Sequence, residues 1–388
     1  MPRLLEDAEL LRRLVAIDSV SRNSNLPIAD FIADYLDGPG VRIARNPSPD
    51  DQKTNLVIEI GPPIEGPDRD GLVLCGHMDT VPADEPGWQS DPFTMTERDG
   101  AWYGRGTADM KGFLALAMNR LALSDPATLR QPLVLLFTYD EELGTLGAEH
   151  FARSWATPAA LPRQVLIGEP TSLRTARLHK GHLKCRFVFA GVSAHSGYPH
   201  LGRNAIEPAA LAVTALADLR RELEGERPPS SELFPEVPYV ALNVALIAGG
   251  AAINIVPDRC VIEVGLRALP GMSRSVIAER VHQAVRQVLP EADFEFMVTG
   301  DSPPFLLDPE AAIHRHVCAA VGQTGSTSVS FATDAGWLQT VGFECVVMGP
   351  GAIEVAHRPD EFIPMDEFRR ASGLLDGLVQ RLCREESP

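Results

Sequence analysis

The sequence predicts an α/β protein: a mixed sheet with covering helices forms the main domain, and a smaller ferredoxin-like α+β domain is inserted into it. Helical and strand patterns alternate along residues 1–180. Over residues 181–297 the order becomes strand, helix, strand, strand, helix, strand, which is the ferredoxin-like order. The alternating pattern returns after that. The expected domains are therefore 1–180 together with 298–388, and the insertion 181–297.

In the first segment, short apolar runs bounded by turn-forming residues indicate buried strands, and amphipathic patterns indicate helices. The expected strands are 55–60, 71–76, 132–139 and 164–169, and the expected helices are about 5–17, 27–37 and 110–124. Strands that alternate with helices favour a sheet covered on both faces.

The inserted segment is expected to form strands 183–190, 239–248, 259–268 and 292–298 and helices 203–223 and 273–288. A proline-rich stretch at 225–238 is expected to be a loop within it. Beyond it we expect a helix at 309–322, a strand at 344–349 and a closing helix at about 366–384.

Composition narrows the function. A chain of 388 residues with 45% hydrophobic and 22% charged residues is ordinary for a soluble globular protein. The net charge of −17 argues against a nucleic-acid partner. The N-terminus lacks the apolar core of a signal peptide, and no apolar stretch is long enough to cross a membrane. Six scattered cysteines without a C-x-x-C pair favour a reduced, cytoplasmic protein.

Polar residues gather where the predicted strands end. Three adjacent carboxylates at 140–142 follow the apolar strand 132–139, and the other candidates, each near a strand end or a helix start, are His77, Asp79, Asp109, Glu169 and His357. Ligands of an open α/β sheet collect at the carboxyl ends of its strands. Imidazole and carboxylate together form the ligand set for zinc or a similar divalent ion. The set is large enough for two ions that share one carboxylate.

Each of these residues also has an ordinary structural explanation. A histidine at a strand end is commonly a satisfied structural residue, adjacent glutamates commonly lie in a solvated loop, and Asp109 suits a helix N-cap. It is the joint pattern of five segments that favours a metal site. Other chemistries fit poorly, because the chain has no G-x-S-x-G, no G-x-G-x-x-G, no G-K-[ST] and no H-E-x-x-H.

At these residues the chain resembles the co-catalytic zinc amidohydrolases, a family that includes acetylornithine deacetylase, succinyl-diaminopimelate desuccinylase, aminoacylases and glutamate-releasing carboxypeptidases. The resemblance covers nearly the whole chain. Its most specific parts are "GHMDTVP", "GRGTADMKGF", "DEELGTLGA", "IGEPTSLRTARLHKGH", "GGAAINIVPDRC" and "GPGAIEVAHRPDEF". Acetylornithine deacetylase is the member that these motifs resemble most.

The resemblance implies a role for each candidate. One divalent ion would bind His77 and Glu169, and the second would bind Glu142 and His357, with Asp109 bridging them. Asp79 would hydrogen-bond to His77 and orient it, and Glu141 would be the general base. Zinc is the expected metal, with cobalt or manganese as alternatives.

For the inserted domain, the resemblance implies that it serves as a lid and dimerisation domain. Its His195 would donate to the oxyanion, often across a dimer interface, and Asn254 and Arg267 would bind substrate. A surface-loop histidine and a plain surface arginine are the alternative interpretations. A homodimer is expected, because the strand order of this domain leaves an edge strand that could pair across a two-fold axis.

The expected reaction is hydrolysis of the amide bond of a small N-acyl amino acid, most simply acetylornithine in arginine biosynthesis. The alternatives are succinyl-diaminopimelate, another acyl-amino acid or a peptide as substrate, and a non-catalytic binding protein on the same fold. Asp334 departs from the glutamate of many acetylornithine enzymes, and we expect its shorter side chain to alter the substrate pocket.

Overall fold

The computed structural model describes residues 4–64, 67 and 69–385. It divides into two compact units. The first unit runs to Leu178 and adds Leu306–Val329 and the chain from Thr333 onward, whereas the second comprises His179–Phe305 and Ser330–Ala332. The second unit is thus longer than the predicted insertion 181–297, because its last strand continues past residue 298 and pairs as far as Ser302 with His182.

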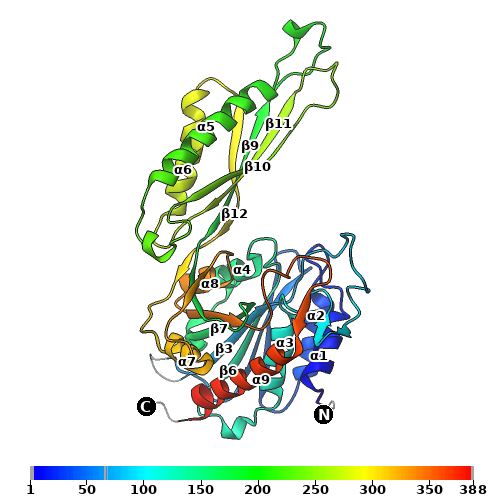
Figure 1. The fold of residues 1–388 in the computed structure, drawn as a ribbon, viewed down its shortest axis with the longest axis vertical. Coiled ribbons are helices and arrows are strands. Elements are labelled where there is room, and N and C mark those ends of the chain that lie inside the picture. The colour runs from blue at the N-terminus through cyan, green and yellow to red at the C-terminus, as the bar shows by residue number, and fades with distance from the viewer. Residues whose placement is uncertain (1–3, 65–66, 68, 386–388) are drawn as a thin grey trace. The chain divides into compact units, whose positions relative to one another are not determined.

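The first unit is built on a mixed sheet with the strand order β1-β2-β6-β3-β7-β15-β8-β13, and β14 pairs with β8 (Figure 1). Strands β6, β3, β7 and β15 run parallel to one another, so their carboxyl ends lie at one edge. The strands are β1 Val41–Pro47, β2 Thr54–Ile60, β3 Leu72–His77, β6 Leu133–Thr138, β7 Gln164–Pro170, β8 Ala176–His179, β13 Phe305–Leu306, β14 Thr327–Val329 and β15 Glu344–Gly349.

Helices cover this sheet, and a small second sheet of strands β4 Thr96–Arg98, β5 Ala101–Tyr103 and β16 Phe362–Pro364 joins distant segments. Helix α3 packs against β3, β6 and β7 and is buried on nearly all sides, because its sequence "KGFLALAMNRLA" is apolar almost throughout. The α-helices are α1 Asp7–Val15, α2 Leu26–Leu36, α3 Lys111–Ala122, α4 Leu146–Ser154, α7 Ala312–Val321, α8 Ala335–Thr340 and α9 Met365–Val379. Short helical turns are η1 Pro126–Thr128, η2 Pro158–Ala160 and η5 Gln380–Arg384.

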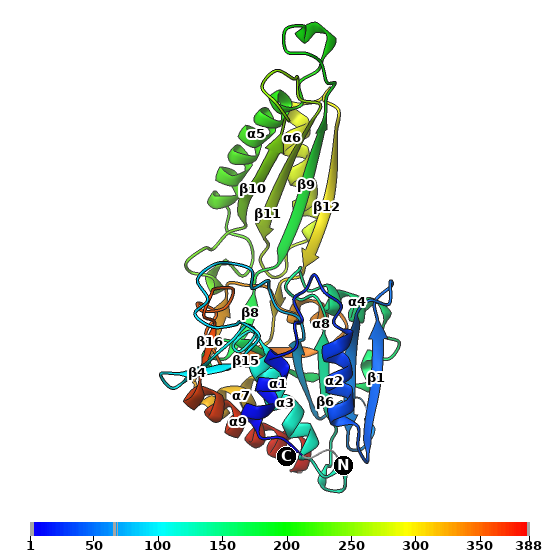
Figure 2. The ribbon, with the colours of Figure 1, turned by 90° about the vertical axis from the view of Figure 1, so that its right-hand side faces the viewer.

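The second unit is a four-stranded antiparallel sheet with the order β10-β11-β9-β12. Helices α5 and α6 lie side by side on one of its faces (Figure 2). Burial alternates along β9 and β11, as expected of strands with one covered face. The elements are β9 His182–Ala190, η3 Pro199–Leu201, α5 Ile206–Gly225, η4 Ser231–Leu233, β10 Ala241–Gly249, β11 Arg259–Arg267, α6 Arg274–Val288 and β12 Phe294–Ser302.

The predicted fold class is confirmed: a mixed α/β sheet with covering helices and an inserted unit of β-α-β-β-α-β order. Among the described residues, no helix is both long enough and apolar enough to span a bilayer.

Close packing of α3 on β7 yields a test of this core. A Cβ added at Gly168 would lie 1.9 Å from Cγ of the buried Phe113. We expect Gly168→Ala to lower the free energy of unfolding by about 1–3 kcal/mol, the usual cost of overpacking. Urea denaturation followed by circular dichroism measures it.

The matched control is Gly373→Ala in α9, where an added Cβ meets no heavy atom within 4 Å. We expect it to be neutral or stabilising by up to about 1 kcal/mol, since alanine favours helix over glycine. Equal stability of Gly168→Ala and the parent would contradict the packing of Phe113 against β7.

Candidate metal centre

The candidate ligands converge at the carboxyl edge of the parallel strands. His77 is the last residue of β3, and Glu169 is the penultimate residue of β7. Glu141 and Glu142 follow β6, and His357 lies in the loop after β15. Asp109 comes two residues before α3. The residues therefore belong to five separate segments that only the folded sheet brings together.

Asp109 lies between the two imidazoles. Its Oδ1 is 3.0 Å from Nε2 of His77, and its Oδ2 is 3.3 Å from Nε2 of His357. Nε2 of His357 is also 3.0 Å from Oε2 of Glu142. The two oxygens of the Asp109 carboxylate thus contact different histidines, which is the arrangement that a bridging ligand needs.

The donor atoms fit divalent cations. Two overlapping groups, His77 with Asp109 and Glu142, and His77 with Glu141 and Glu169, each place their ligand atoms within 4.8 Å of one another. Imidazole nitrogen and carboxylate oxygen are the donors that zinc and similar ions take. His77, Asp109 and Glu169 are buried, and a buried group of carboxylates needs a compensating charge.

Electrostatics shows how crowded the carboxylates are. Burial, together with the charge of Glu169, raises the pKa of Glu141 well above its ordinary value. Burial and the charge of Asp109 raise the pKa of Glu142 to about 7. Hydrogen bonds to Asp109 and Glu142 raise the pKa of His357 to about 10. Burial and crowding therefore favour the protonated forms of Glu141, Glu142 and His357, an effect that the positive charge of a bound cation would oppose.

Asp79 contacts both His77 and the loop that carries the two glutamates. Nδ1 of His77 lies 3.0 Å from the backbone carbonyl of Asp79 and 3.6 Å from its carboxylate. The carboxylate instead accepts from Ser21 Oγ at 2.7 Å and from the backbone N–H groups of Glu141 and Glu142 at 3.1 and 3.3 Å. The backbone carbonyl of Asp79 thus holds the imidazole of His77 so that Nε2 faces Asp109. The side chain of Asp79 holds the loop that carries Glu141 and Glu142.

The three adjacent carboxylates, Asp140, Glu141 and Glu142, do not all face the same way. Asp140 pairs with Lys53, whereas the two glutamates face the candidate metal centre. Asp140 forms an ion pair with Lys53, which also donates to the carbonyl of Ser21. Asp140 has a left-handed backbone with φ of +48°, and the turn that follows sends the next two glutamates toward the cluster. Burial raises the pKa of Asp140 to about 6. Only two of the three acidic residues therefore face the candidate metal centre.

Asp334, whose shorter side chain was expected to alter the substrate pocket, lies close enough to the cluster to influence Glu141 and Glu169 electrostatically. Its side chain is buried with 2% exposure, and its Oδ2 accepts a 2.6 Å hydrogen bond from Thr138 Oγ1. Burial raises the pKa of Asp334 to about 6. Two other buried charged residues at the site, Arg105 and Glu361, were not predicted to matter, although "GRGT" and "HRPDEF" lie within the motifs.

In the second unit, the structure brings His195 and Asn254 together. His195 forms an isolated β-bridge with Ile255, and Ser196 N donates to Asn254 O at 2.9 Å. Both His195 and Asn254 are exposed.

Arg267 is not part of that group. It is half-buried at the other end of β11, whose nine residues separate the two ends by roughly 26 Å at 3.3 Å per residue. The expected substrate-binding pair of Asn254 and Arg267 is therefore not formed within one copy of this unit.

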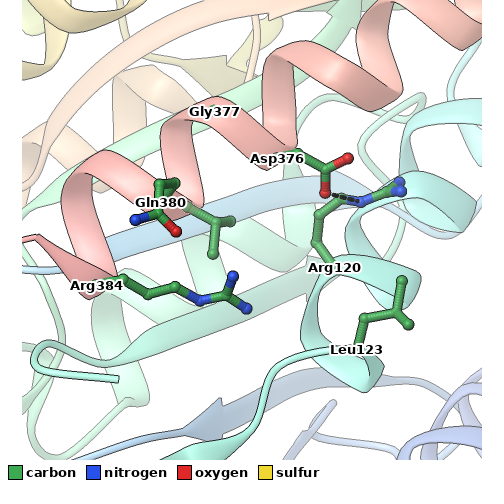
Figure 3. Close-up of a pocket in the computed structure, with 7 residues that line it drawn as sticks. Arg120, Leu123, Asp376, Gly377, Gln380 and Arg384 are labelled. Atoms are coloured by element: carbon green, nitrogen blue, oxygen red, sulfur yellow. Dashed lines mark hydrogen bonds and ion pairs between the residues drawn. The ribbon is translucent and has the colours of Figure 1, made fainter. Parts of the chain in front are cut away.

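A hollow of about 450 Å³ beside α3 and α9 lies away from these residues (Figure 3). Arg120 and Asp376 form a 2.9 Å ion pair at its wall. It is lined by Arg120, Leu123, Asp376, Gly377, Val379, Gln380 and Arg384, none of which was a candidate.

The sheet and its donor set define a metal-dependent hydrolase of α/β fold. Residues 73–381 match peptidase family M20/M25/M40, and the chain belongs to this family, which confirms the predicted resemblance.

Acetylornithine deacetylase of Proteus mirabilis (strain HI4320) is 36% identical over 388 residues, covering 97% of each protein. The acetylornithine deacetylase of Edwardsiella ictaluri (strain 93-146) is also 36% identical, covering 97% of each. Among solved structures, the M20 family metallo-carboxypeptidase Sso-CP2 from Sulfolobus solfataricus superposes with a TM-score of 0.77 at 17% identity, covering 97% of this chain and 99% of that one. The dinuclear metal-binding M20 peptidase YXEP of Bacillus subtilis gives a TM-score of 0.67 at 15% identity, covering 97% of each chain.

The pKa shifts predict how the metal-free protein responds to pH. The pKa of Glu142 rises from 4.5 to about 7 on folding and that of His357 from 6.5 to about 10. A pKa raised on folding means that the folded state binds more protons, so its stabilisation is present at low pH and is lost as pH rises. We expect the thermal midpoint of chelator-treated protein to fall between pH 6 and pH 9, as scanning calorimetry can measure.

Two controls separate this effect from general charge repulsion. Glu142→Gln barely alters the net charge of −17, and it should make the thermal midpoint of the metal-free protein depend less on pH. Added Zn²⁺ should reverse the fall of the thermal midpoint with pH, because metal binding requires deprotonated ligands and strengthens as pH rises. A metal-free midpoint that is constant or higher at pH 9 would show that the cluster does not hold these protons.

Proposed function

We propose that the protein is a dinuclear metal-dependent deacylase whose preferred substrate is N-acetylornithine, acting in arginine biosynthesis. The observation that carries the metal chemistry is Asp109, whose two oxygens face His77 and His357. The substrate is inferred from the relatives that match over nearly their full length at 35–36% identity, which are named acetylornithine deacetylases. The six free, buried cysteines accord with a reducing compartment such as the cytoplasm.

His77 and Glu169 would hold one ion, Glu142 and His357 the other, and Asp109 both. We propose Zn²⁺, with Co²⁺ or Mn²⁺ as alternatives. Divalent ions bound there would lower the pKa of a bound water and polarise the carbonyl of the scissile amide.

Glu141 is the proposed general base. It removes a proton from the attacking water as the new C–O bond forms, and it returns the proton to the amide nitrogen as the C–N bond breaks. The products are acetate and the free amino acid. A carboxylate whose pKa is raised by burial suits both steps, because it accepts the proton readily and can still release it to an amine.

We also propose an isologous homodimer formed through the second unit. Strand β10 is an unpaired edge of its sheet. It exposes Leu246 and Ile247, and the nearby loop and helix α5 expose Ile253 and Leu211. Exposed apolar side chains on and near an open strand edge favour pairing with a second copy.

The dimer would complete the active site. His195 and Asn254 lie beside the end of β10, where a hollow is lined by Ser196, Gly249 and Ile253 among others. Arg267, at the other end of β11, adjoins the segment that connects to the first unit, because Ala268 O accepts from Gly181 N. We propose that His195 and Asn254 serve the partner's substrate and that Arg267 binds a substrate carboxylate.

A substrate panel tests the function. We expect the zinc-loaded protein to release acetate from N-acetylornithine with a higher kcat/KM than it hydrolyses succinyl-diaminopimelate or dipeptides. Glu141→Gln should bind zinc as the parent does while losing about 10²–10⁴-fold in kcat, because it cannot accept the proton. Preference for another substrate would reassign the reaction, and near-normal turnover of Glu141→Gln with intact zinc content would remove this residue from the mechanism.

Mixing two inactive variants tests the dimer. Glu141→Gln and His195→Ala are combined under conditions that allow subunit exchange. If His195 acts on the partner's site, a mixed dimer regains one working site, and random exchange should restore about a quarter of parental activity. If His195 serves its own chain, every site carries one defect. Continued inactivity, with exchange verified by differently tagged chains, would refute action in trans.

A further inference from the structure

A buried carboxylate outside the proposed ligand set receives four donors. Glu361 is 1% exposed. Its Oε1 accepts from the backbone N–H groups of Ala108 at 2.9 Å and Asp109 at 3.0 Å. Its Oε2 accepts from Gly106 N at 3.0 Å and from Nη1 of Arg105 at 2.9 Å. All four contacts are with donors, so both carboxylate oxygens of Glu361 act as acceptors.

Arg105 extends this connection to a third segment. It is also 1% exposed, and it donates to the carbonyl of Pro82 at 3.0 Å and to the carboxylate of Glu85. It further donates to the carbonyl of Arg358 at 3.3 Å. The Arg105–Glu361 pair therefore joins the segment after β3, the segment before α3 and the segment after β15.

These three segments carry proposed ligands. His77 ends β3, Asp109 itself donates to Glu361, and His357 precedes Glu361 by four residues in the same loop. One buried carboxylate thus fixes the main chain at Asp109 to the loop that presents His357. Building on the metal roles proposed above, we propose that Glu361 and Arg105 are positioning residues that set the separation of Asp109 from His357, and hence the affinity of the metal centre.

A purely structural ion pair is the competing explanation, and the chain offers a matched control. Arg120 is 7% exposed and donates to Asp7 at 3.0 Å, and Asp7 also accepts from Asn119 at 2.7 Å and Ser372 at 2.8 Å. This pair likewise joins distant segments of the first unit, but those segments carry no proposed ligand.

The test measures Zn²⁺ affinity by competition with a chelating indicator, for the parent, Glu361→Gln and Asp7→Asn. A glutamine has one acceptor oxygen, and its amide NH₂ would face donors. We expect Glu361→Gln to weaken Zn²⁺ binding by about 10–100-fold, the usual effect of losing a group that orients metal ligands. Asp7→Asn should lower the thermal midpoint of the metal-free protein and leave the Zn²⁺ affinity unchanged.

Arg105→Lys provides a second variant in case Glu361→Gln does not fold. It keeps the charge but loses the planar fork, and we expect a smaller loss of Zn²⁺ affinity. Parental affinity in a folded Glu361→Gln or Arg105→Lys, or an equal loss in Asp7→Asn, would overturn the proposal. A parent that binds two Zn²⁺ ions without releasing acetate from acetylornithine refutes only the proposed substrate, whereas a parent that binds none refutes both.

Discussion

The concentration of carboxylates at one edge of the sheet is the constraint on which the candidate site depends. Four acidic side chains and two imidazoles meet where β3, β6, β7 and β15 end. The strands beneath them are almost entirely apolar, so these charged groups gather at the edge, where the strands end. Burial makes their mutual repulsion costly, and it raises the pKa of Glu141, Glu142 and Glu169. Bound cations would supply the compensating charge.

The protein arranges its ligands mainly through backbone N–H groups. Asp79 accepts from the N–H groups of Glu141 and Glu142, and Glu361 accepts from that of Asp109. These two carboxylates orient the loops that carry the candidate ligands by accepting hydrogen bonds from the loop backbone. Basic side chains pair with the acidic residues that face away from the cluster, as Lys53 does with Asp140. These contacts would hold the candidate ligand atoms in place and leave their negative charge available to a metal ion.

The sequence predicted the candidate ligands better than the residues that hold them in position, such as Glu361 and Arg105. Apolar strands followed by His77 or Glu169 are recognisable because parallel strands end at a common edge. Glu361 and Arg105 lie in polar loops, and their importance comes from contacts between segments 256 residues apart. Strand β1, with the sequence "VRIARNP", was missed because its polar residues conceal the alternation. The end of β12 was placed too early because pairing with β9, which no local pattern reveals, extends it.

The positions of Asn254 and Arg267 in the inserted unit show why a role inferred from sequence resemblance must be compared with the structure. Sequence similarity suggests that Asn254 and Arg267 bind one substrate, but the full length of β11 lies between them. A small acyl-amino acid cannot span roughly 26 Å, the length of a nine-residue strand at 3.3 Å per residue. In the homodimer proposed above, two copies of the unit would meet along the exposed β10 edge, and each substrate would receive the two residues from different chains. In this proposal, the exposed β10 edge, which would make a monomer prone to association, would serve to assemble the substrate site.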